Sequence, residues 1–473
     1  MSQVGPPSEV EGYAYYYVSW TTGDDLTGTG TLSNPFKTIT HALQTASTDH
    51  TVVRVAGGAN AIYKVDPGAS SWETFPLTAA LDDVTIEGYR EPKPTISLKD
   101  AEGSFGAYSS APAAFVVDGR TDWTFKNLRL DASEHNTNAS PVRGIHVCDL
   151  PANGTITVQD CEIVDFFDGI YFEDSGSYDP EDDMRTIVID STAVSRCGPV
   201  SAFSPNFDDK GHAGIRLLEA QSRAMQLTVT DCVLESNHDA LEPGGAVLFV
   251  SDTRFELNEN GLEYASTTQA SGRHGGRAQV YGCWFVDNEP LDAAEGGVPG
   301  PTGGIVARNL ELLNLSVRQT DFEGNQIGAS FKGGTSGNDG GIEFGTAHSG
   351  EDRGDNSFVT DTTSPWYQGQ DHTVSYCGLF NSADVVIHAV GNTWTFESIP
   401  PGPDYNQGAD SNGQFPSTLG SLTIGAEVNF DSGAQFPYHR ALFGTTDPQQ
   451  PWNYSTGPVE SAPAGTPSIV LVP

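Results

Sequence analysis

Apolar and polar residues alternate in two consecutive stretches near the middle of the chain. The first runs from Leu227 to Leu234 and is followed by Asn237, and the second runs from Val247 to Phe255 and is followed by Asn258. Alternation of this kind places one face of a strand in the core and the other face in water. The pattern therefore predicts two half-buried β-strands, each followed by a turn at an asparagine.

The same phrase recurs at four other places, residues 156–163, 187–193, 278–285 and 315–322. A small residue holds the equivalent position in every copy, in steps of 21 to 41 residues: Cys161, Ser191, Cys232, Thr253, Cys283 and Thr320. A second phrase begins with Gly-Ile and lies between the copies, at Gly144, Gly169, Gly214, Gly304 and Gly341. Repeats of this length, built from strands, indicate a solenoid in which each coil buries its apolar face against the next.

These phrases resemble the strands of right-handed parallel β-helix proteins of the pectate-lyase-like superfamily, over about residues 15–332. The resemblance implies an all-β fold, a right-handed parallel β-helix (solenoid) with a short N-terminal capping helix and a C-terminal β/loop region. We expect the lead and helical cap in residues 1–50, the β-helix in 51–359, and a C-terminal cap or assembly region in 360–473. Proteins of this fold include lyases, hydrolases, epimerases, adhesins and viral spikes, so the fold does not decide the function.

Two columns of side chains are expected in the solenoid. The small residue, such as Cys161 or Cys232, points inward and fills space, which is a role for a small apolar side chain rather than for a disulfide or a zinc ligand. The asparagine that follows, as at Asn237 and Asn258, is expected to adopt the left-handed turn and to bond its neighbours' backbone. Stacked asparagines would then form a ladder.

The N-terminal region carries the most specific motif, which is similar to the opening of many β-helix proteins. Tyr15–Ser19 is followed by a Gly/Asp/Thr loop at 23–30 and by the segment Ser33–Leu43. We predict a helix capped by Ser33 or Asn34 that closes the end of the solenoid. Its buried face would consist of Phe36, Ile39, Leu43 and Ala46.

The chain is strongly acidic, with 23 Lys and Arg against 62 Asp and Glu and a formal net charge of -39. Such an excess repels itself unless salt screens it. We interpret it as adaptation to high salt, in a halophilic (haloarchaeal or haloarchaeal-virus) protein or one from a salt-in bacterium. The alternative is an acidic secreted protein or cation binder. Nucleic acid is not expected as a partner, because the field has the wrong sign.

The first residues do not resemble a signal peptide, so we expect either that a leader has been removed or that the protein reaches the outside without one, and no run approaches the length of a membrane span. A virion protein is released by lysis and needs no leader, so we expect the extracellular space or the virion surface, without membrane insertion. The expected partners are a cell-surface glycan or glycoprotein, with other virion proteins as candidates. A homotrimer is a candidate by analogy with viral spikes.

Catalysis by a polysaccharide lyase needs a base and a cation near a uronate. The best basic cluster is Lys210, His212 and Arg216, which are the catalytic candidates if the chain is an enzyme. A hydrolase needs paired carboxylates on one face, and Asp239 with Glu242 is one such pair. Scattered solvated charges are the favoured explanation of both sets, because the chain is so acidic.

A third set of residues consists of candidates for binding a ligand. Trp284 neighbours the inward Cys283, so it should face outward as a platform for a sugar. The other candidate ligand-binding residues are His238, Asp239 and Arg273. Asp174, Asp179 and Asp182 form an acidic loop that suits Ca2+ or bound monovalent salt cations, although no cofactor is required.

Two functions remain open on the sequence. The first is a structural protein, extracellular or on a virion, that presents a glycan- or receptor-binding surface in the manner of a tail-spike or tail adhesin under high salt. The second is a polysaccharide lyase or glycoside hydrolase that acts on acidic polysaccharide. The sequence favours the non-enzymatic interpretation but leaves the choice between them undecided.

Overall fold

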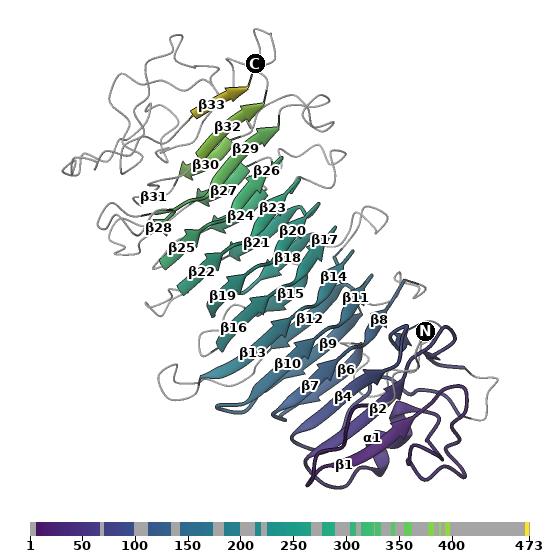
Figure 1. Ribbon diagram of the computed structural model, residues 1–473. Helices are drawn as coiled ribbons and strands as arrows, with labels where there is room; N and C mark the ends of the chain where they lie inside the picture. Colours follow the sequence, from purple (N-terminus) through teal and green to yellow (C-terminus); the bar gives the residue numbers. More distant parts are fainter. Residues whose placement is uncertain are drawn as a thin grey trace. The chain divides into compact units, whose positions relative to one another are not determined.

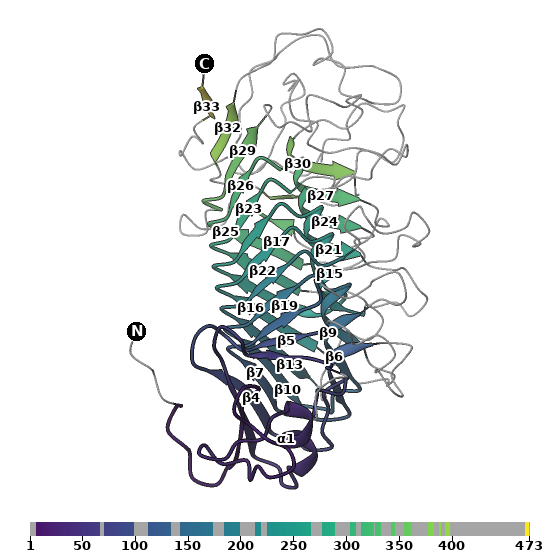
Figure 2. The same cartoon turned by 90° about the vertical axis from the view of Figure 1, so that its right-hand side faces the viewer.

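The structure is a computed structural model of the chain. It describes residues 6–66, 71–98, 112–133, 142–173, 184–198, 213–218, 225–265, 277–288, 303–308, 314–325, 327–332, 342–345, 354–361, 377–382, 387–388, 393–397 and 469–472. The chain divides into unit 1, Met1–Val233, and unit 2, Leu234–Pro473. Within each unit the strands follow one another through three parallel sheets in a fixed order (Figures 1 and 2). This is a right-handed parallel β-helix, as predicted.

In unit 1 the first sheet consists of β1 (Ala14–Val18), β2 (Thr51–Ala56), β4 (Val84–Tyr89), β7 (Trp123–Lys126), β10 (Thr155–Gln159), β13 (Arg185–Asp190) and β16 (Met225–Thr230). The second consists of β3 (Ile62–Tyr63), β5 (Thr95–Ser97), β8 (Arg129–Asp131), β11 (Glu162–Val164) and β14 (Ala193–Ser195). The third consists of β6 (Ala113–Asp118), β9 (Arg143–Cys148), β12 (Asp168–Glu173) and β15 (Ala213–Leu217).

In unit 2 the first sheet consists of β19 (Val247–Ser251), β22 (Arg277–Tyr281), β25 (Asn314–Arg318), β28 (Ile342–Glu343) and β31 (Ile387–His388). The second consists of β20 (Arg254–Glu256), β23 (Trp284–Val286), β26 (Asp321–Glu323), β29 (Ser357–Asp361), β32 (Thr393–Glu397) and β33 (Ile469–Val472). The third consists of β18 (Asp239–Glu242), β21 (Asn260–Ala265), β24 (Gly303–Arg308), β27 (Ile327–Lys332) and β30 (Cys377–Ser382). The boundary between the units falls within β17 (Val233–Glu235).

The register of the first sheet shows that one residue predicted to point inward, Ser191, was chosen wrongly. Val158 of β10 lies opposite Ile189 of β13, so Cys161 is matched by Thr192, which lies three residues after Ile189, and not by Ser191. The Thr192 hydroxyl accepts a hydrogen bond from the Cys161 amide at 3.3 Å. Ser191 instead has a φ of 50° and is exposed, because it forms the turn itself. The cysteines whose side chains the structure describes are free thiols: Cys148, Cys161, Cys197, Cys232 and Cys283.

The asparagine ladder is present in unit 2, where Asn237, Asn258, Asn288 and Asn325 are all buried. The side-chain oxygens of the last three each accept from the previous asparagine, for example Asn258 Nδ2 to Asn288 Oδ1 at 3.0 Å. The left-handed residue is the one before each asparagine, such as Leu257 with a φ of 57°. The predicted ladder is therefore confirmed, but the predicted left-handed asparagine is wrong by one residue.

Another predicted strand lies in a different sheet from the one expected. The Gly-Ile phrase at Gly341 was grouped with the third-sheet strands, but Ile342 lies opposite Leu315 and belongs to the first sheet. The Gly-Ile strands that do belong to the third sheet require glycine at this position. A Cβ on Gly169 would lie 2.5 Å from the Gly214 carbonyl oxygen and 2.9 Å from a methyl of Val194, so a larger residue does not fit there.

Helix α1 (Ile39–Thr45) lies beside β1 and β2, which begin the first sheet (Figure 1). Its N-cap is Thr38, whose side chain accepts from the His41 amide at 3.0 Å, so the predicted caps Ser33 and Asn34 are wrong. The carboxylate of Glu73 is fully buried and accepts from the Ile39 and Thr40 amides at 2.8 and 2.9 Å. Burial raises the pKa of Glu73 to about 7, against the effect of these hydrogen bonds. No helix in the described part of the chain is long and apolar enough to cross a membrane.

Candidate functional site

Polar side chains are buried on the third sheet of unit 2. Leu241 of β18 lies opposite Leu262 of β21, and both leucines are in the core. Successive side chains of a strand point to opposite sides, so Glu242 and Glu263, which follow these leucines, point away from the core. We call the following residues the unit 2 polar cluster: His238, Asp239, Glu242, Glu259, Asn260 and Glu263.

A single amide group joins two carboxyls of this cluster. Asn260 Nδ2 donates to Asp239 Oδ1 at 2.7 Å and to Glu263 Oε2 at 2.9 Å. The oxygen of the same amide accepts from the Gly303 backbone at 3.3 Å, which fixes its orientation. His238 lies at the edge of the cluster, with Nδ1 3.1 Å from Asp239 Oδ2 and Nε2 3.2 Å from Glu259 Oε2. The two adjacent strands thus hold a connected network of hydrogen bonds and ion pairs.

The network lowers the pKa of Asp239. Burial favours the neutral form of Asp239, but His238 and the hydrogen bonds from Glu263 and Asn260 together lower its pKa to about 2. Asp239 is therefore ionised at neutral pH. The Glu263 carboxyl lies beside this carboxylate, because both accept from the Asn260 amide.

Glu242 supplies a further carboxyl group on the strand next to Glu263. It is 9% exposed, and Asp239 and Glu263 are 3% and 7% exposed. Carboxyl groups are almost never buried to this degree without a specific role or partner. Groups with strongly shifted pKa values that share a buried network are typical of functional sites. The unit 2 polar cluster is therefore the candidate site.

Raising the pH from about 6.5 to above 9 is expected to reduce the stability of the chain by about 1–2 kcal/mol. Burial opposes the charge on His238, but Asp239 and Glu259 outweigh it and raise its pKa from 6.5 to about 9. The ion pairs therefore stabilise the fold fully below pH 6.5 and are lost as the pH rises through 9. Urea unfolding across this range measures the effect, and His238→Gln should show no such decline. Parallel pH profiles for the two proteins would contradict the assignment.

Unit 1 carries a second polar group on its third sheet, here called the unit 1 polar cluster: Arg143, His146, Cys148, Asp168, Tyr171 and Glu173. The Arg143 guanidinium lies 3.6 Å from the centre of the Tyr171 ring and 3.5 Å from Asp168 Oδ2. Burial raises the pKa of Asp168, although Arg216 and Arg143 counter it. Burial also raises the pKa of Tyr171 to about 12. A hydrogen bond from His146 lowers the pKa of Glu173.

The predicted basic cluster is described only in part. Arg216 lies on β15, where it is the register partner of Tyr171, and its charge acts on Asp168. The other two predicted catalytic residues, Lys210 and His212, lie outside the described residues, as does Arg273. The predicted metal ligands Asp174, Asp179 and Asp182 also lie outside them. His238 and Asp239, which were proposed as ligand-binding residues, are brought together with each other but not with Trp284.

Trp284 lies on the second sheet of unit 2 and is 40% exposed. Its register partners are Arg254 on β20 and Asp321 on β26, one on either side. Burial raises the pKa of Asp321, and a hydrogen bond with Trp284 opposes the shift. An exposed indole flanked by charged hydrogen-bonding groups on rigid strands can stack on a sugar ring.

Sequence reasoning missed Asn260, Glu263 and Arg143, and it considered Asp168 only as one of several carboxylate pairs, with Asp165. A signal for them exists in the Gly-Ile phrase and in its variant Gly261-Leu262. Arg143, Asp168 and Asn260 directly precede the glycine of their strand, and His146, Tyr171 and Glu263 stand two positions after it. These are the outward positions of each third-sheet strand. Following them from coil to coil would have placed both clusters.

Comparisons with known proteins leave the function open. A family model described as "Protein of unknown function (DUF1565)" matches residues 21–160. No curated protein matches the chain. Among solved structures, a GH136 lacto-N-biosidase from Eubacterium ramulus is 14% identical with a TM-score of 0.35, and the alignment covers 81% of this chain but only 63% of that one. The chain therefore spans less than two thirds of that enzyme.

Two further solved structures are similar to the chain. Pectate lyase Pel9A is 12% identical with a TM-score of 0.39, and the alignment covers 89% of this chain and 91% of the lyase. The A-module of the mannuronan C-5 epimerase AlgE6 from Azotobacter vinelandii is 15% identical with a TM-score of 0.39, with 76% and 81% covered. Likeness at this level concerns the fold alone, so the function must be argued from the residues of this chain.

Proposed function

We propose that the chain is a glycan-directed β-helix and that its unit 2 polar cluster hydrolyses a glycosidic bond. The observation that carries the proposal is the buried pair of carboxyls, Asp239 and Glu263, which share the Asn260 amide and of which Asp239 has a pKa lowered to about 2. Glycoside hydrolysis needs one carboxylic acid and one carboxylate beside the scissile bond. Environments that give two neighbouring carboxyls different pKa values allow one to act as an acid and the other as a base at the same pH.

In this proposal Glu263 is the general acid that protonates the leaving oxygen of the glycosidic bond. Glu242, on the adjacent strand and facing the same side, is the carboxylate partner that activates water or attacks the sugar. Asp239 and Asn260 are positioning residues, since their hydrogen bonds orient the Glu263 carboxyl. The chemistry needs no cofactor, because proton transfer between carboxyls, sugar and water completes it.

The proposal also covers the binding partner, the salt environment, the location and the oligomeric state that the sequence led us to expect. An outward Trp284 supports a glycan or glycoprotein as the binding partner on the second sheet. The net charge of -39 supports a protein that works in high salt. A virion or tail-spike role, an extracellular location and a homotrimer are compatible with a β-helix that binds glycans. In that second candidate function the chain binds a sugar at Trp284 and leaves it uncut.

One experiment separates the two functions. The purified chain is incubated with a panel of neutral and acidic polysaccharides, with EDTA, in dilute buffer and in molar KCl. New reducing ends report hydrolysis, and ultraviolet absorbance reports the unsaturated sugar that a lyase would form. We expect new reducing ends without unsaturated sugar, and faster turnover in molar KCl. Glu263→Gln should slow turnover by about 10²–10⁴-fold and leave sugar binding unchanged.

The matched control is Glu323→Gln, which changes an exposed glutamate on β26 of the same unit and should leave turnover unchanged. Trp284→Ala should weaken binding of the polysaccharide. Binding that depends on Trp284, with no product from any polysaccharide, would overturn the hydrolase in favour of the adhesin. Unsaturated product would overturn it in favour of a lyase.

A further inference from the structure

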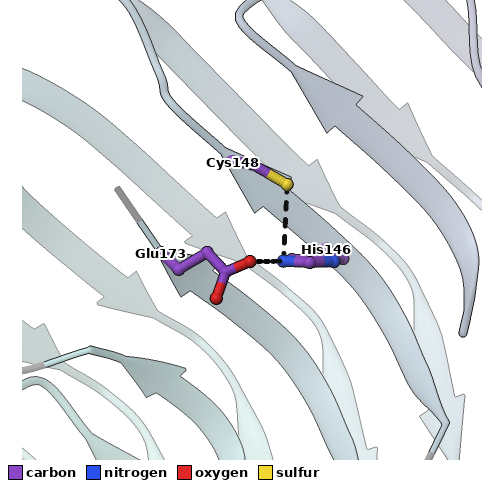
Figure 3. A group of neighbouring side chains, drawn as sticks. All are labelled: His146, Cys148 and Glu173. Atoms are coloured by element: carbon purple, nitrogen blue, oxygen red, sulfur yellow. Dashed lines mark hydrogen bonds and ion pairs between the residues drawn. The ribbon is translucent and has the colours of Figure 1, made fainter. Parts of the chain in front are cut away.

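Three potential metal-ligand atoms converge in the unit 1 polar cluster (Figure 3). His146 and Cys148 are two residues apart on β9 and so point to the same side of the strand. Glu173 is the register partner of Cys148 on β12. His146 Nε2 lies 2.8 Å from Glu173 Oε1 and 3.4 Å from Cys148 Sγ, and the three ligand atoms all lie within 4.8 Å of one another. Two adjacent strands therefore hold a nitrogen, a sulfur and an oxygen around one point.

Arg143 does not occupy that point. Its Nη1 atom is 3.4 Å from Nδ1 and 3.3 Å from Nε2 of His146. An atom equally far from both ring nitrogens, at this distance and in the ring plane, would collide with the carbon between them. Arg143 therefore lies over the face of the imidazole. Figure 3 shows the imidazole edge-on, with the Glu173 oxygen ahead of Nε2 and the Cys148 sulfur to one side of the ring plane.

A single proton on His146 Nε2 does not account for the contacts of both Glu173 and Cys148 with that atom. A neutral imidazole carries a single N–H, which at Nε2 would serve the Glu173 carboxylate alone. The thiol of Cys148 then meets the same nitrogen without a lone pair to donate to. A cation in place of the proton satisfies all three atoms at once, because nitrogen, thiolate and carboxylate each direct a lone pair at it.

We propose that His146, Cys148 and Glu173 form a binding site for a soft divalent cation of the zinc class. Zinc takes nitrogen and sulfur ligands in a tetrahedron, which puts nitrogen and sulfur about 3.6 Å apart and nitrogen and oxygen about 3.3 Å apart. The sulfur is 3.4 Å from Nε2, and the oxygen, at 2.8 Å, needs a small outward movement. Glu173 can make it, because its side chain is 37% exposed.

The donor set selects the metal. Calcium and magnesium prefer oxygen ligands throughout, whereas imidazole and thiolate favour zinc and its soft neighbours. Three protein ligands leave the fourth position to water, and the exposed Glu173 side opens it to solvent. Asp118 of β6 is the other register partner of Cys148, and its charge would attract the cation. The site lies in unit 1 and is independent of the hydrolase proposed for unit 2.

The test is metal binding by the full chain, stripped with a chelator and kept in molar KCl so that the 62 carboxylates bind little metal without specificity. Titration calorimetry with Zn2+ should show one strong site that releases a proton. Co2+ should give the intense visible bands of a tetrahedral ion and a near-ultraviolet thiolate-to-metal band. His146→Ala and Cys148→Ser should each weaken Zn2+ binding by about 100-fold or more, and Cys148→Ser should remove the thiolate band.

Two controls keep the test decisive. Cys283→Ser changes a cysteine of unit 2 and should leave both affinity and the thiolate band intact. Circular dichroism of every variant shows whether it is folded, and Cys148→Ser changes only one atom of a half-buried side chain. An octahedral cobalt spectrum without a thiolate band, or full Zn2+ affinity in folded Cys148→Ser, would overturn the site.

Discussion

Replacing Asn288 with alanine is expected to lower the free energy of unfolding by about 4 kcal/mol or more. Its Nδ2 donates to the Asn325 side chain at 2.7 Å and to the Phe255 carbonyl at 3.0 Å. Its Oδ1 accepts from the backbone and side chain of Asn258 at 3.2 and 3.0 Å. All of these groups are buried, so water cannot replace the lost partner, and each unsatisfied group costs about 1–3 kcal/mol.

Urea unfolding followed by circular dichroism measures the loss. Asn314→Ala is the matched control, because Asn314 is an exposed asparagine at the start of β25 in the same unit, and its replacement should cost less than about 0.5 kcal/mol. Asn288→Asp should be at least as harmful as alanine, since a carboxylate accepts but cannot donate. Equal stabilities for the Asn288→Ala and Asn314→Ala proteins would show that the ladder is not a source of stability.

The ladder and the coils could be predicted because they depend on residues a fixed distance apart in sequence. Alternation gives the strand faces, and the recurring asparagine gives the position of the turn. The error at Ser191 has a physical cause. Ser191 and Thr192 are both small, and the turn needs one residue in the left-handed region beside one that points inward. A slip of one residue exchanges the two faces, and composition alone does not choose between them.

The helix cap was mispredicted for a related reason. Ser33, Asn34 and Thr38 are all good N-caps by residue type. Phe36 is held in extended backbone, because its amide donates to the Tyr17 carbonyl and its carbonyl accepts from the Ser19 amide. The helix can therefore begin only after Phe36, at a residue that is free to leave the strand. This depends on contacts with β1 that sequence spacing does not show.

The candidate site was the least predictable part. Asp239 was selected, but its partner Glu263 lies 24 positions later in the sequence, on the next coil. In a chain with 62 acidic residues, many carboxyls will lie on adjacent coils by chance. What distinguishes this pair is its burial and the shared amide of Asn260, and both depend on the register of β18 against β21. The metal-ligand group around Cys148 depends on register in the same way.

Replacing Phe285 with alanine is the second change expected to have a large effect, a loss of about 3–5 kcal/mol in the free energy of unfolding. Phe285 is fully buried, and its ring is stacked between Phe255 at 4.5 Å and Phe322 at 5.0 Å, with interplanar angles of 5° on both sides. Alanine would leave a cavity in the middle of the column. The strands on either side are held at a fixed spacing by their backbone ladder, so they cannot close it.

Thermal and urea unfolding of Phe285→Ala measure the cost, and Phe285→Leu should recover more than half of it because most of the volume returns. Phe249→Ala is the matched control, since Phe249 is a half-buried phenylalanine on the outward side of β19 and should cost about 1 kcal/mol. The comparison tests the mechanism as well as the magnitude. Since the ladder holds the coils apart, the loss at Phe285 should follow the volume removed. Equal losses for the alanine and leucine variants would instead show that ring stacking, and not the filling of space, is the main source of the stability at this position.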